Sequence, residues 1–421
     1  MRKDTRATWR VLLAVTVLLV AAGCAGATDP KPGTELVWAV GGLGAADAGP
    51  AHDIANQWNA LHPHGPRVRV EALPETTDDQ HQLLTLELNA GLSHFDILNL
   101  DVIWTAEFAQ KGWLVDLDTL RPEIEQVSLP QAVQTAVWQG KLWAAPYTTD
   151  VGILYYRKDL VHQPPATWEE LDQVGRQVGA QHQMAPYVAD GARYEGLVVQ
   201  YLEYLWAAGG RLLDPDAQSV LFQTAPALKA LTFMETAFRT GLYAPGFDTM
   251  NLEDARATFQ SGQAVFMRSW PYAYQQMNHD DPTSQVKGKI GVAPLPTFAG
   301  SAPVAALGGG DLAVSKFSRD VPDATEFVKF VSTSRAIQRE LAERYSVAPT
   351  LKAAYDDVAD DPMMTLLTKV LPTARPRPAT PEWSTISEQI QQQVFAGYTG
   401  NAEPRQVIAG LHAFLVATVG G

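Results

Sequence analysis

The stretch FDILNLDVIWTAEFAQKG, residues 95–112, carries the pattern on which the fold prediction rests. Its first part, Phe95 to Leu100, is a short apolar run that is typical of a buried strand and is followed by a carboxylate, Asp101. Its second part, Trp104 to Gly112, has the spacing of a helix that stops at a glycine. A buried strand followed at once by a helix is the unit of a helix-covered sheet, and ligands on such sheets usually meet the strand ends.

Strand-like and helix-like segments alternate along the rest of the chain. Short apolar or alternating runs predict strands at residues 35–40, 67–72, 151–156, 290–296 and 311–315. Helical spacing predicts helices up to about residue 61, at 80–90, 168–178, 195–208, 226–238, 323–334 and 337–343, and through most of 385–417. Residues 305–310, AALGGG, are expected to form a glycine-rich passage between two strands. This alternation implies an α/β fold with mainly parallel central sheets.

The length of 421 residues predicts at least two substantial lobes, because a typical domain has about 100 to 200 residues. Hydrophobic residues make up 46% of the chain and charged residues 19%, a balance that supports folded cores and excludes general disorder. No segment resembles an independent linker between two sequential domains. We therefore expect two lobes that share the chain by crossing between them more than once.

The first residues have the three parts of an export signal. The positive start holds Arg2, Lys3, Arg6 and Arg10. An apolar run from Val11 to Ala22 follows, and small residues then lead into the one cysteine of the chain, Cys24. The arrangement resembles a bacterial lipoprotein signal, in which Cys24 becomes the lipid-bearing N-terminus, although Ala21 stands where that pattern usually has leucine. An ordinary cleaved signal with an incidental cysteine is the alternative.

Cleavage before Cys24 would remove residues 1–23 and leave 398 residues. Residues 24–33 are small and polar with proline, which is typical of a short tether. The mature chain would hold 28 basic and 45 acidic residues, so its net charge would be −17 rather than −14. We expect it to be tethered to the outer face of the cytoplasmic membrane, or to be periplasmic.

Several classes of partner and reaction are disfavoured by the sequence. Nucleic acid is a poor partner, because binding a polyphosphate relies on a surplus of Lys and Arg. The chain contains no GxSxG, HExxH or GxxxxGK(S/T) motif and no spaced cysteine ligands. Gly42-Leu43-Gly44 follows the first predicted strand, but Asp47 occupies the third glycine position of a dinucleotide loop, where a carboxylate would repel a pyrophosphate. We expect no cofactor and no metal ion.

Aromatic residues lie next to single carboxylates at four predicted strand ends or turns. Three pairs are Asp101 with Trp104, Asp150 with Tyr147, and Tyr194 with Glu195, and the fourth is the aromatic pair Trp270 with Tyr272 in RSWPYAY. A neutral sugar needs this combination, because carboxylates accept hydrogen bonds from its hydroxyls while its C–H faces lie on aromatic rings. A sugar-binding cleft is therefore the leading interpretation.

Structural roles are the alternative for several of these residues. Trp104 lies in a helical segment and is more typical of core than of a site. Tyr147 could pack at the boundary between lobes, and Glu195 could cap its own helix. Asp101 and Asp150 are harder to explain in this way, because each adjoins a strongly apolar strand where a bare carboxylate needs a reason.

At these residues the chain resembles the extracellular solute-binding proteins of carbohydrate ABC transporters, and within that family the trehalose/maltose-binding proteins. The resemblance covers about residue 34 to the C-terminus. It rests on the segments LNLDVIWTAEFAQKGWLVDL (98–117), GKLWAAPYTTDVGILYYRKDL (140–160), RYEGLVVQYLEYLWAAGG (193–210), FQSGQAVFMRSWPYAY (259–274), VKGKIGVAPLP (286–296) and ARPRPATPEW (374–383). YEGL, RSWPYAY and RPATP in this order are the more specific motifs and point to α-linked glucose disaccharides.

The resemblance implies a periplasmic-binding-protein-like fold, with two α/β lobes joined by a multi-segment hinge and the sugar in the cleft. Residues 34–145 with about 305–355 would form the first lobe, and 146–304 with about 356–421 the second. The implied ligand-binding residues are Asp101 and Asp150 as acceptors, Trp270 and Tyr272 as a stacking floor, Tyr194 as a further wall, Arg377 as a donor, and Gly309.

Asp47 stands in the loop after the first predicted strand, where relatives often have an acidic sugar ligand. Two further positions depart from the relatives. His81 falls near an arginine of the trehalose/maltose binders, and histidine is shorter and usually neutral. Gly310 stands where those relatives place a second stacking tryptophan, so one subsite should be weaker or reshaped.

The implied function is that of a monomeric, non-catalytic sugar receptor that delivers a di- or oligosaccharide to ABC permease subunits. Two alternatives remain. An exported glycoside hydrolase could use Asp101 and Asp150 as an acid and nucleophile pair. A receptor of the same fold could instead bind another oligosaccharide or a non-sugar solute, although an acidic cleft disfavours an anionic ligand.

Overall fold

The computed structural model describes residues 35–46, 49–214, 217–278 and 283–419, which belong to one compact unit, Pro32–Gly421. The signal segment, Cys24, the tether and Asp47 lie outside the described residues. Within the described ranges, no helix is both long enough and apolar enough to cross a membrane.

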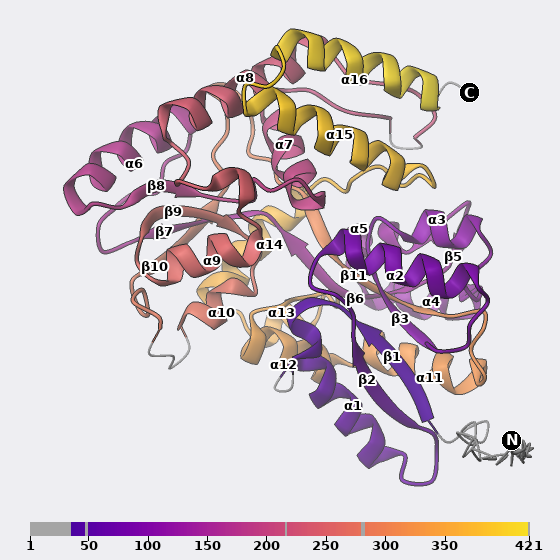
Figure 1. Cartoon of the computed structure of the whole chain (residues 1–421). Coiled ribbons are helices and arrows are strands. Elements are labelled where there is room, and N and C mark those ends of the chain that lie inside the picture. Colours follow the sequence, from indigo (N-terminus) through magenta and orange to yellow (C-terminus); the bar gives the residue numbers. More distant parts are fainter. Residues whose placement is uncertain (1–34, 47–48, 215–216, 279–282, 420–421) are drawn as a thin grey trace, which may run out of the picture. The chain divides into compact units, whose positions relative to one another are not determined.

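Two sheets organise the unit (Figure 1). The first has the order β12-β6-β11-β3-β1-β2, and the second has the order β10-β7-β9-β8. A separate two-stranded ribbon pairs β4 with β5. The strands are β1 (Glu35–Val40), β2 (Arg67–Ala72), β3 (Ile97–Asp101), β4 (Val137–Trp138), β5 (Lys141–Leu142), β6 (Ala145–Val151), β7 (Ile153–Arg157), β8 (Ala185–Val188), β9 (Ala264–Ser269), β10 (Ile290–Pro294), β11 (Leu307–Val314) and β12 (Ala348–Pro349).

Helices cover both sheets: α1 packs on β2, α5 and α11 on β6, α6 on β8, α9 on β9 and α14 on β10. The helices are α1 (Pro50–Leu61), α2 (Thr77–Asn89), α3 (Thr105–Gln110), α4 (Arg121–Val127), α5 (Pro130–Thr135), α6 (Trp168–His182), α7 (Glu195–Ala207), α8 (Thr224–Thr240), α9 (Leu252–Gln260), α10 (Ala273–Asn278), α11 (Val321–Thr333), α12 (Arg335–Tyr345), α13 (Ala354–Asp357), α14 (Pro362–Val370), α15 (Trp383–Tyr398) and α16 (Pro404–Val419).

The predicted two-lobed α/β fold is confirmed, but the sheets are mixed rather than mainly parallel. Strand β1 is parallel to β2 and β3, as expected for strand–helix–strand units. Strands β6 and β11 lie where the chain passes between the sheets, and β11 is antiparallel to both β3 and β6. In the second sheet only β8 and β9 are parallel. The alternation of strands and helices therefore predicted the parallel direction of β1, β2 and β3. It did not predict the antiparallel pairing of β11 with β3 and β6, where the chain crosses between the sheets.

The crossing points also differ in detail from the predicted elements. The run expected as one strand at 151–156 is interrupted at Gly152, where β6 of the first sheet ends and β7 of the second begins. The glycine run expected to lie between strands is part of β11. Because β6 pairs within the first sheet, the chain leaves that sheet after Val151. The lobe limits themselves stay a prediction.

Aromatic side chains fill the core of each part. Trp38 on β1 is fully buried and makes edge contacts with Tyr147 and Phe327. Trp104 is 2% exposed and stacks on Phe108, so its interpretation as a core residue is confirmed. Glu107, in the same helix as Phe108, is also buried, which shows that helix α3 lies under other elements on most of its surface.

Asp311 on β11 is an unusual residue in this core. Its side chain is buried, and neither carboxylate oxygen has a hydrogen-bond partner of normal geometry among the described residues. Burial raises the pKa of Asp311 to about 8, and the Thr135 hydroxyl offsets this rise only in part. The native state therefore favours the neutral acid at neutral pH, whereas the unfolded chain would be ionised.

We predict that Asp311 makes the protein less stable as the pH rises from 4 to 8. Over this range the folded state holds a proton that unfolding releases, so the free energy of unfolding should fall by up to about 1.4 kcal/mol per pH unit through this residue. Asp311→Asn should reduce the slope and raise the melting temperature at pH 8. Urea titrations at several pH values measure this, and an identical slope in the variant would contradict it.

Candidate functional site: a cleft between the two sheets

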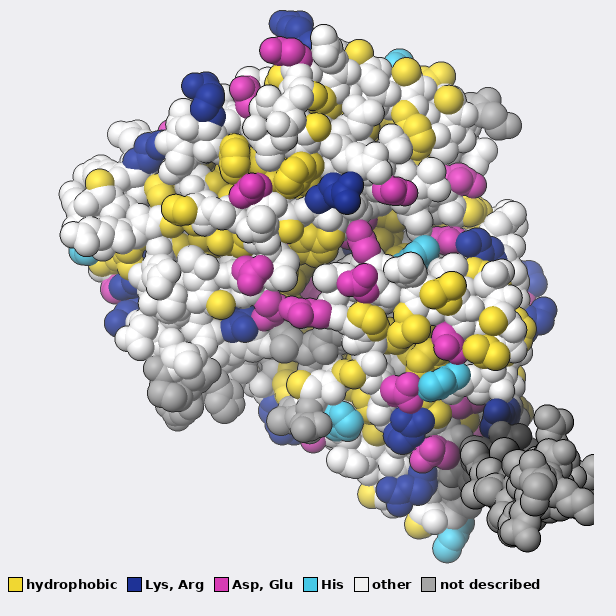
Figure 2. Space-filling view, viewed as in Figure 1, with side chains coloured by type: hydrophobic (Ala, Val, Ile, Leu, Met, Phe, Trp, Pro, Cys, Tyr) yellow, Lys and Arg dark blue, Asp and Glu magenta, His cyan; other side chains and the backbone are white. Residues whose placement is uncertain are grey.

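A cavity of about 950 Å³ lies between the elements of the two sheets. The first sheet contributes the ends of β1 and β3 and the strands β6 and β11, and the second part contributes the starts of α7 and α9 and the segment after β9. Figure 2 shows acidic side chains gathered along this hollow. The charged lining residues are Glu75, Asp101, Asp150, Glu195, Glu253, Arg344 and Arg377. The excess of carboxylates suits a ligand that donates hydrogen bonds.

The structure brings most of the predicted ligand-binding residues together in this cavity. The lining includes Asp101, Asp150, Tyr194, Trp270, Tyr272, Gly309 and Arg377. Asp47 lies outside the described residues, although its neighbours Ala46 and Gly49 line the cavity. The seven lining residues come from six separate stretches of the chain, so their proximity depends on the fold as a whole.

His81 is placed beside the cavity and not in its lining, where Gln80 of the same helix lies instead. The His81 Nε2 atom is 2.8 Å from Glu107 Oε2 and 3.1 Å from the Ser384 hydroxyl. Despite burial, hydrogen bonds that include His81 lower the pKa of Glu107 to about 2. Successive helical residues point about 100° apart, which separates His81 from Gln80 and directs it to α3 and α15.

Arg377 connects two acidic residues across the cavity. Its Nη1 donates to Glu195 Oε1 over 2.7 Å, and its Nη2 donates to Asp101 Oδ1 over 3.0 Å. The Arg377 side chain is 2% exposed, so both contacts are made in a largely water-free environment. A guanidinium suits this role because its rigid donors can serve two carboxylates at once.

Glu195 is a functional candidate whose role the sequence did not reveal. It is the first residue of α7, as the capping interpretation required, but its carboxylate is buried and also accepts from Trp383 Nε1 and Ser387 Oγ. Burial raises its pKa to about 7, and Arg377 offsets this rise. The sequence signal for the pairing of Glu195 with Arg377 was a single acid at the start of an apolar helix. That signal does not identify the partner, because Arg377 lies more than 180 residues away.

Asp150 presents an acceptor in the cavity wall. Its Oδ1 atom is buried and has no hydrogen-bond partner among the described residues. Burial raises the pKa of Asp150 to about 7; Arg268 offsets the rise and Asp101 adds to it. A buried carboxylate oxygen without a donor is costly, and because Asp150 lines the cavity, its carboxylate is placed to accept a hydrogen bond from a ligand hydroxyl.

Aromatic rings complete two walls of the cavity. One face of Trp270 is covered by the Arg268 guanidinium, whose carbon lies 4.0 Å from the ring centroid. The Tyr272 hydroxyl donates to Glu253 Oε1 over 2.8 Å, and the Tyr194 hydroxyl donates to Asp190. The polar atoms of both tyrosines are thus engaged, and their rings remain to contact a ligand.

The glycines of β11 bring the backbone close to these side chains. A Cβ atom on Gly308 would lie 3.0 Å from the Trp270 ring, and one on Gly310 would lie 2.5 Å from Asn99 Oδ1. Gly309 has a φ of +119° and would place a Cβ 2.7 Å from Thr149 Cα. A tryptophan at position 310 would therefore require Asn99 to move.

The family model for the bacterial extracellular solute-binding protein matches residues 41–338. The chain belongs to this family. A "Probable ABC transporter-binding protein" of Deinococcus radiodurans is 31% identical over 374 residues, which are 85% of this solute-binding protein and 87% of the relative. The similarity thus extends over most of both proteins.

Solved structures agree with the family assignment. Maltose-bound MalE3 of T. maritima has a TM-score of 0.84 at 34% identity and covers 91% of this chain and 99% of its own. A solute-binding protein from Thermotoga lettingae bound to α-D-tagatose also has a TM-score of 0.84, at 23% identity over 92% of this chain and 100% of its own. The second likeness supports the two-lobed fold of this solute-binding protein.

We predict that Arg377→Met destabilises the protein by about 3 to 5 kcal/mol, because it leaves two largely buried carboxylates without their cation. Adding Glu195→Gln should restore part of the loss, since one unpaired charge is then removed. Arg377→Lys is the matched control and should be intermediate, because one ammonium replaces a two-sided donor. Urea unfolding measures all three, and an unchanged midpoint in Arg377→Met would show that the bridge is not stabilising.

Proposed function

We propose that this solute-binding protein captures an α-linked glucose disaccharide, trehalose or maltose, in its cleft and delivers it to an ABC permease. The observation that carries the proposal is the wall formed by Asp150 and Trp270. Asp150 offers a buried acceptor without a donor, and Trp270 has one face fixed on Arg268. Both lie against the same glycine, since a Cβ on Gly308 would be within 3.5 Å of each. Adjacent acceptor and ring are what a pyranose needs.

The surrounding residues support a neutral ligand of this class. Five acidic and two basic side chains are in the charged lining, and both arginines are already paired with carboxylates. An anionic solute would meet an excess of negative charge. The maltose in the MalE3 structure, from a protein 34% identical to this one, favours an α-glucoside over other neutral sugars.

Capture would proceed by closure of the two lobes around the sugar. Contacts from both sides favour a closed state over an open one only if they are made together. A disaccharide of about 23 heavy atoms, at ~0.3 kcal/mol each, would bind with about 7 kcal/mol, which is a dissociation constant of order 10 μM. Such affinity suits a scavenging receptor. Transport energy would come from a separate ATPase.

We further propose that the receptor acts as a monomer and without catalysis, and that Cys24 carries the lipid that holds it at the cell surface. The hydrolase alternative has one observation in its favour, because Asp150 has a pKa raised to about 7 near the arginine-paired Asp101. Incubation of trehalose or maltose with the purified protein decides between them. Release of glucose would support the hydrolase, and unchanged sugar would support the receptor.

We predict that Trp270→Ala weakens trehalose or maltose binding at least tenfold with little change in melting temperature, because the ring is a cavity wall. Trp104→Ala is the matched control, since that ring is buried in the core. It should lower the melting temperature strongly and preserve affinity in the folded protein. Calorimetric titration with trehalose, maltose, maltodextrins and sucrose measures the affinities. Binding weaker than millimolar for all of them would refute the α-glucoside proposal.

We also predict that sugar affinity falls as the pH drops below about 7. The unliganded pKa of Asp150 is raised to about 7, and sugar hydroxyls that donate to the carboxylate should lower it in the complex. Binding then releases a proton below pH 7, so affinity should fall by up to about tenfold per pH unit. Asp150→Asn should bind weakly without this dependence, whereas Glu195→Gln serves as the comparison because Glu195 also has a raised pKa. An unaltered pH profile in Asp150→Asn would assign the dependence to another group.

A further inference from the structure

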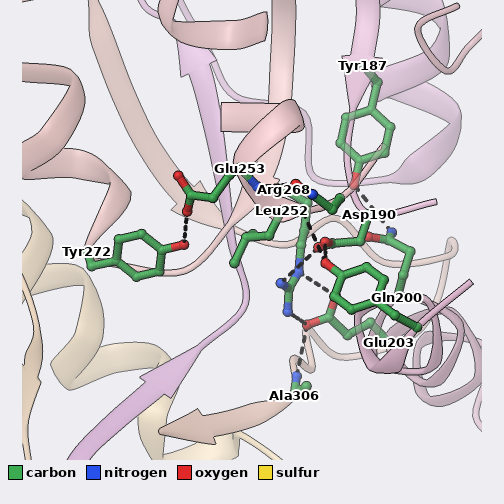
Figure 3. A network of polar contacts seen from close by, with 11 residues as sticks. Tyr187, Asp190, Gln200, Glu203, Leu252, Glu253, Arg268, Tyr272 and Ala306 are labelled. Carbon is green, nitrogen blue, oxygen red and sulfur yellow. Dashed lines mark hydrogen bonds and ion pairs between the residues drawn. The ribbon is translucent and has the colours of Figure 1, made fainter. Parts of the chain in front are cut away.

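A buried ion pair lies outside the cavity lining, between helix α7 and strand β9 (Figure 3). Arg268 donates from Nε to Glu203 Oε2 over 3.0 Å and from Nη2 to Glu203 Oε1 over 2.8 Å. Both side chains are only 1% exposed. Two parallel hydrogen bonds fix the plane of the guanidinium as well as its position. A buried ion pair adds little net stability compared with apolar residues. A role for this pair is therefore expected in the groups that it contacts on either side.

One side of the pair holds the backbone where the chain crosses between the sheets. Glu203 Oε1 also accepts a hydrogen bond of 3.1 Å from Ala306 N, just before β11. Gly152, between β6 and β7, donates from its nitrogen to Ala306 O over 3.2 Å. A Cβ on Gly152 would collide with Glu203 Oε1 and lie 2.9 Å from Arg268 Nη2. The pair is therefore in contact with both crossing segments.

The other side of the pair faces the cavity wall. The Arg268 guanidinium covers one face of Trp270 at 4.0 Å from the ring centroid. The edge of the same ring lies against Gly308, two residues after Ala306. The segment that donates to Glu203 thus leads directly into β11, the strand that the Trp270 ring contacts. A change in the angle between β9 and this strand must alter at least one of these contacts.

A third contact extends the network to the starts of α7 and α9, which line the same side of the cavity as Trp270. Arg268 Nη1 lies 3.8 Å from Asp190 Oδ2, and Asp190 accepts the hydroxyl hydrogen bond of Tyr194. The Tyr194 oxygen in turn accepts from Leu252 N at the start of α9, over 3.1 Å. Arg268 therefore contacts the Trp270 ring directly and lies near Asp190, which orients the Tyr194 ring.

We propose that Glu203 and Arg268 are positioning residues that couple the bend of the crossing segments to the orientation of Trp270, and thereby set the affinity of the cleft. The coupling rests on the proposed function in one respect only, the contact of Trp270 with the sugar. The mechanical part, from Gly152 through the ion pair to the ring, does not depend on a ligand.

Gly152→Ala tests the coupling from a position that does not line the cavity. The added methyl displaces Glu203 or Arg268, so the near-UV circular dichroism of Trp270, isolated by subtraction of the Trp270→Phe spectrum, should change without ligand. Affinity for maltose or trehalose should fall at least tenfold. Gly65→Ala is the matched control, because its Cβ would make an ordinary contact of 3.4 Å at an exposed turn. An unchanged spectrum together with unchanged affinity would overturn the proposal.

A double-mutant cycle tests whether the effect passes through the ring. In a Trp270→Ala background, Gly152→Ala should weaken sugar binding less than twofold further. A full tenfold loss in that background would show that Gly152 acts by another route and would also overturn the proposal.

Arg268→Lys provides a second variant if Gly152→Ala does not fold. Lysine keeps the charge but lacks the flat face and the fork of donors, so the Trp270 signal should change and affinity should again fall at least tenfold. Retention of both would contradict the coupling. If the wild-type protein binds neither sugar, the proposed function fails, whereas the ligand-free spectra still decide the coupling.

Discussion

The arrangement of the cleft depends on backbone hydrogen bonds among three segments that meet between the sheets. Gly152 N donates to Ala306 O over 3.2 Å. Leu307 N donates to Arg375 O over 2.8 Å, and Arg375 N donates to Ala305 O over 2.9 Å. Buried backbone groups must be paired, so the three segments cannot shift independently. Each segment places a cavity residue two positions from its pairing site: Asp150, Gly308 and Arg377. A change in this backbone pairing would therefore displace the acceptor Asp150, the backbone at Gly308 and the donor Arg377 together.

Electrostatics in the cleft favour ligand capture over stability. Burial raises the pKa values of Asp150 and Glu195 to about 7, which means that their charged forms are held at a cost. Arg377 compensates Glu195 and Asp101 directly, but Asp150 Oδ1 has no donor among the described residues. Functional sites commonly retain such costs because an acceptor already satisfied by the protein cannot also serve the ligand.

Much of the fold was predictable from the sequence because it follows from local periodicity. The strands at 35–40 and 67–72 and the helix at 195–208 were predicted nearly to the residue. Asp101 and Asp150 could be singled out because a carboxylate beside a buried strand is conspicuous, and both line the cavity, although their binding roles stay a prediction. These signals are local. Once the strands are predicted to share a sheet, the residues at their ends are expected to lie at the same edge.

The missing parts are those that depend on distant partners. Strand direction at β11 follows from a crossing between sheets, and no local pattern encodes it. Glu203 and Arg268 each carry a charge within an apolar segment, LVVQYLEYLW and AVFMRSW, which signals a buried partner but not its identity. They are separated by 65 residues, so only the tertiary structure pairs them.

The glycine run of β11 shows that an absent side chain can be a structural requirement. Gly308 leaves space for Trp270, Gly309 has a backbone conformation that favours glycine, and Gly310 lies against Asn99. The three residues line the cavity as bare backbone. A second aromatic platform at Gly310 would require the Asn99 side chain to move. If the ligand is the sugar that we propose, discrimination must then come from the walls that carry side chains, where Asp150, Trp270 and the Arg377 bridge lie, since bare backbone presents much the same surface to any pyranose.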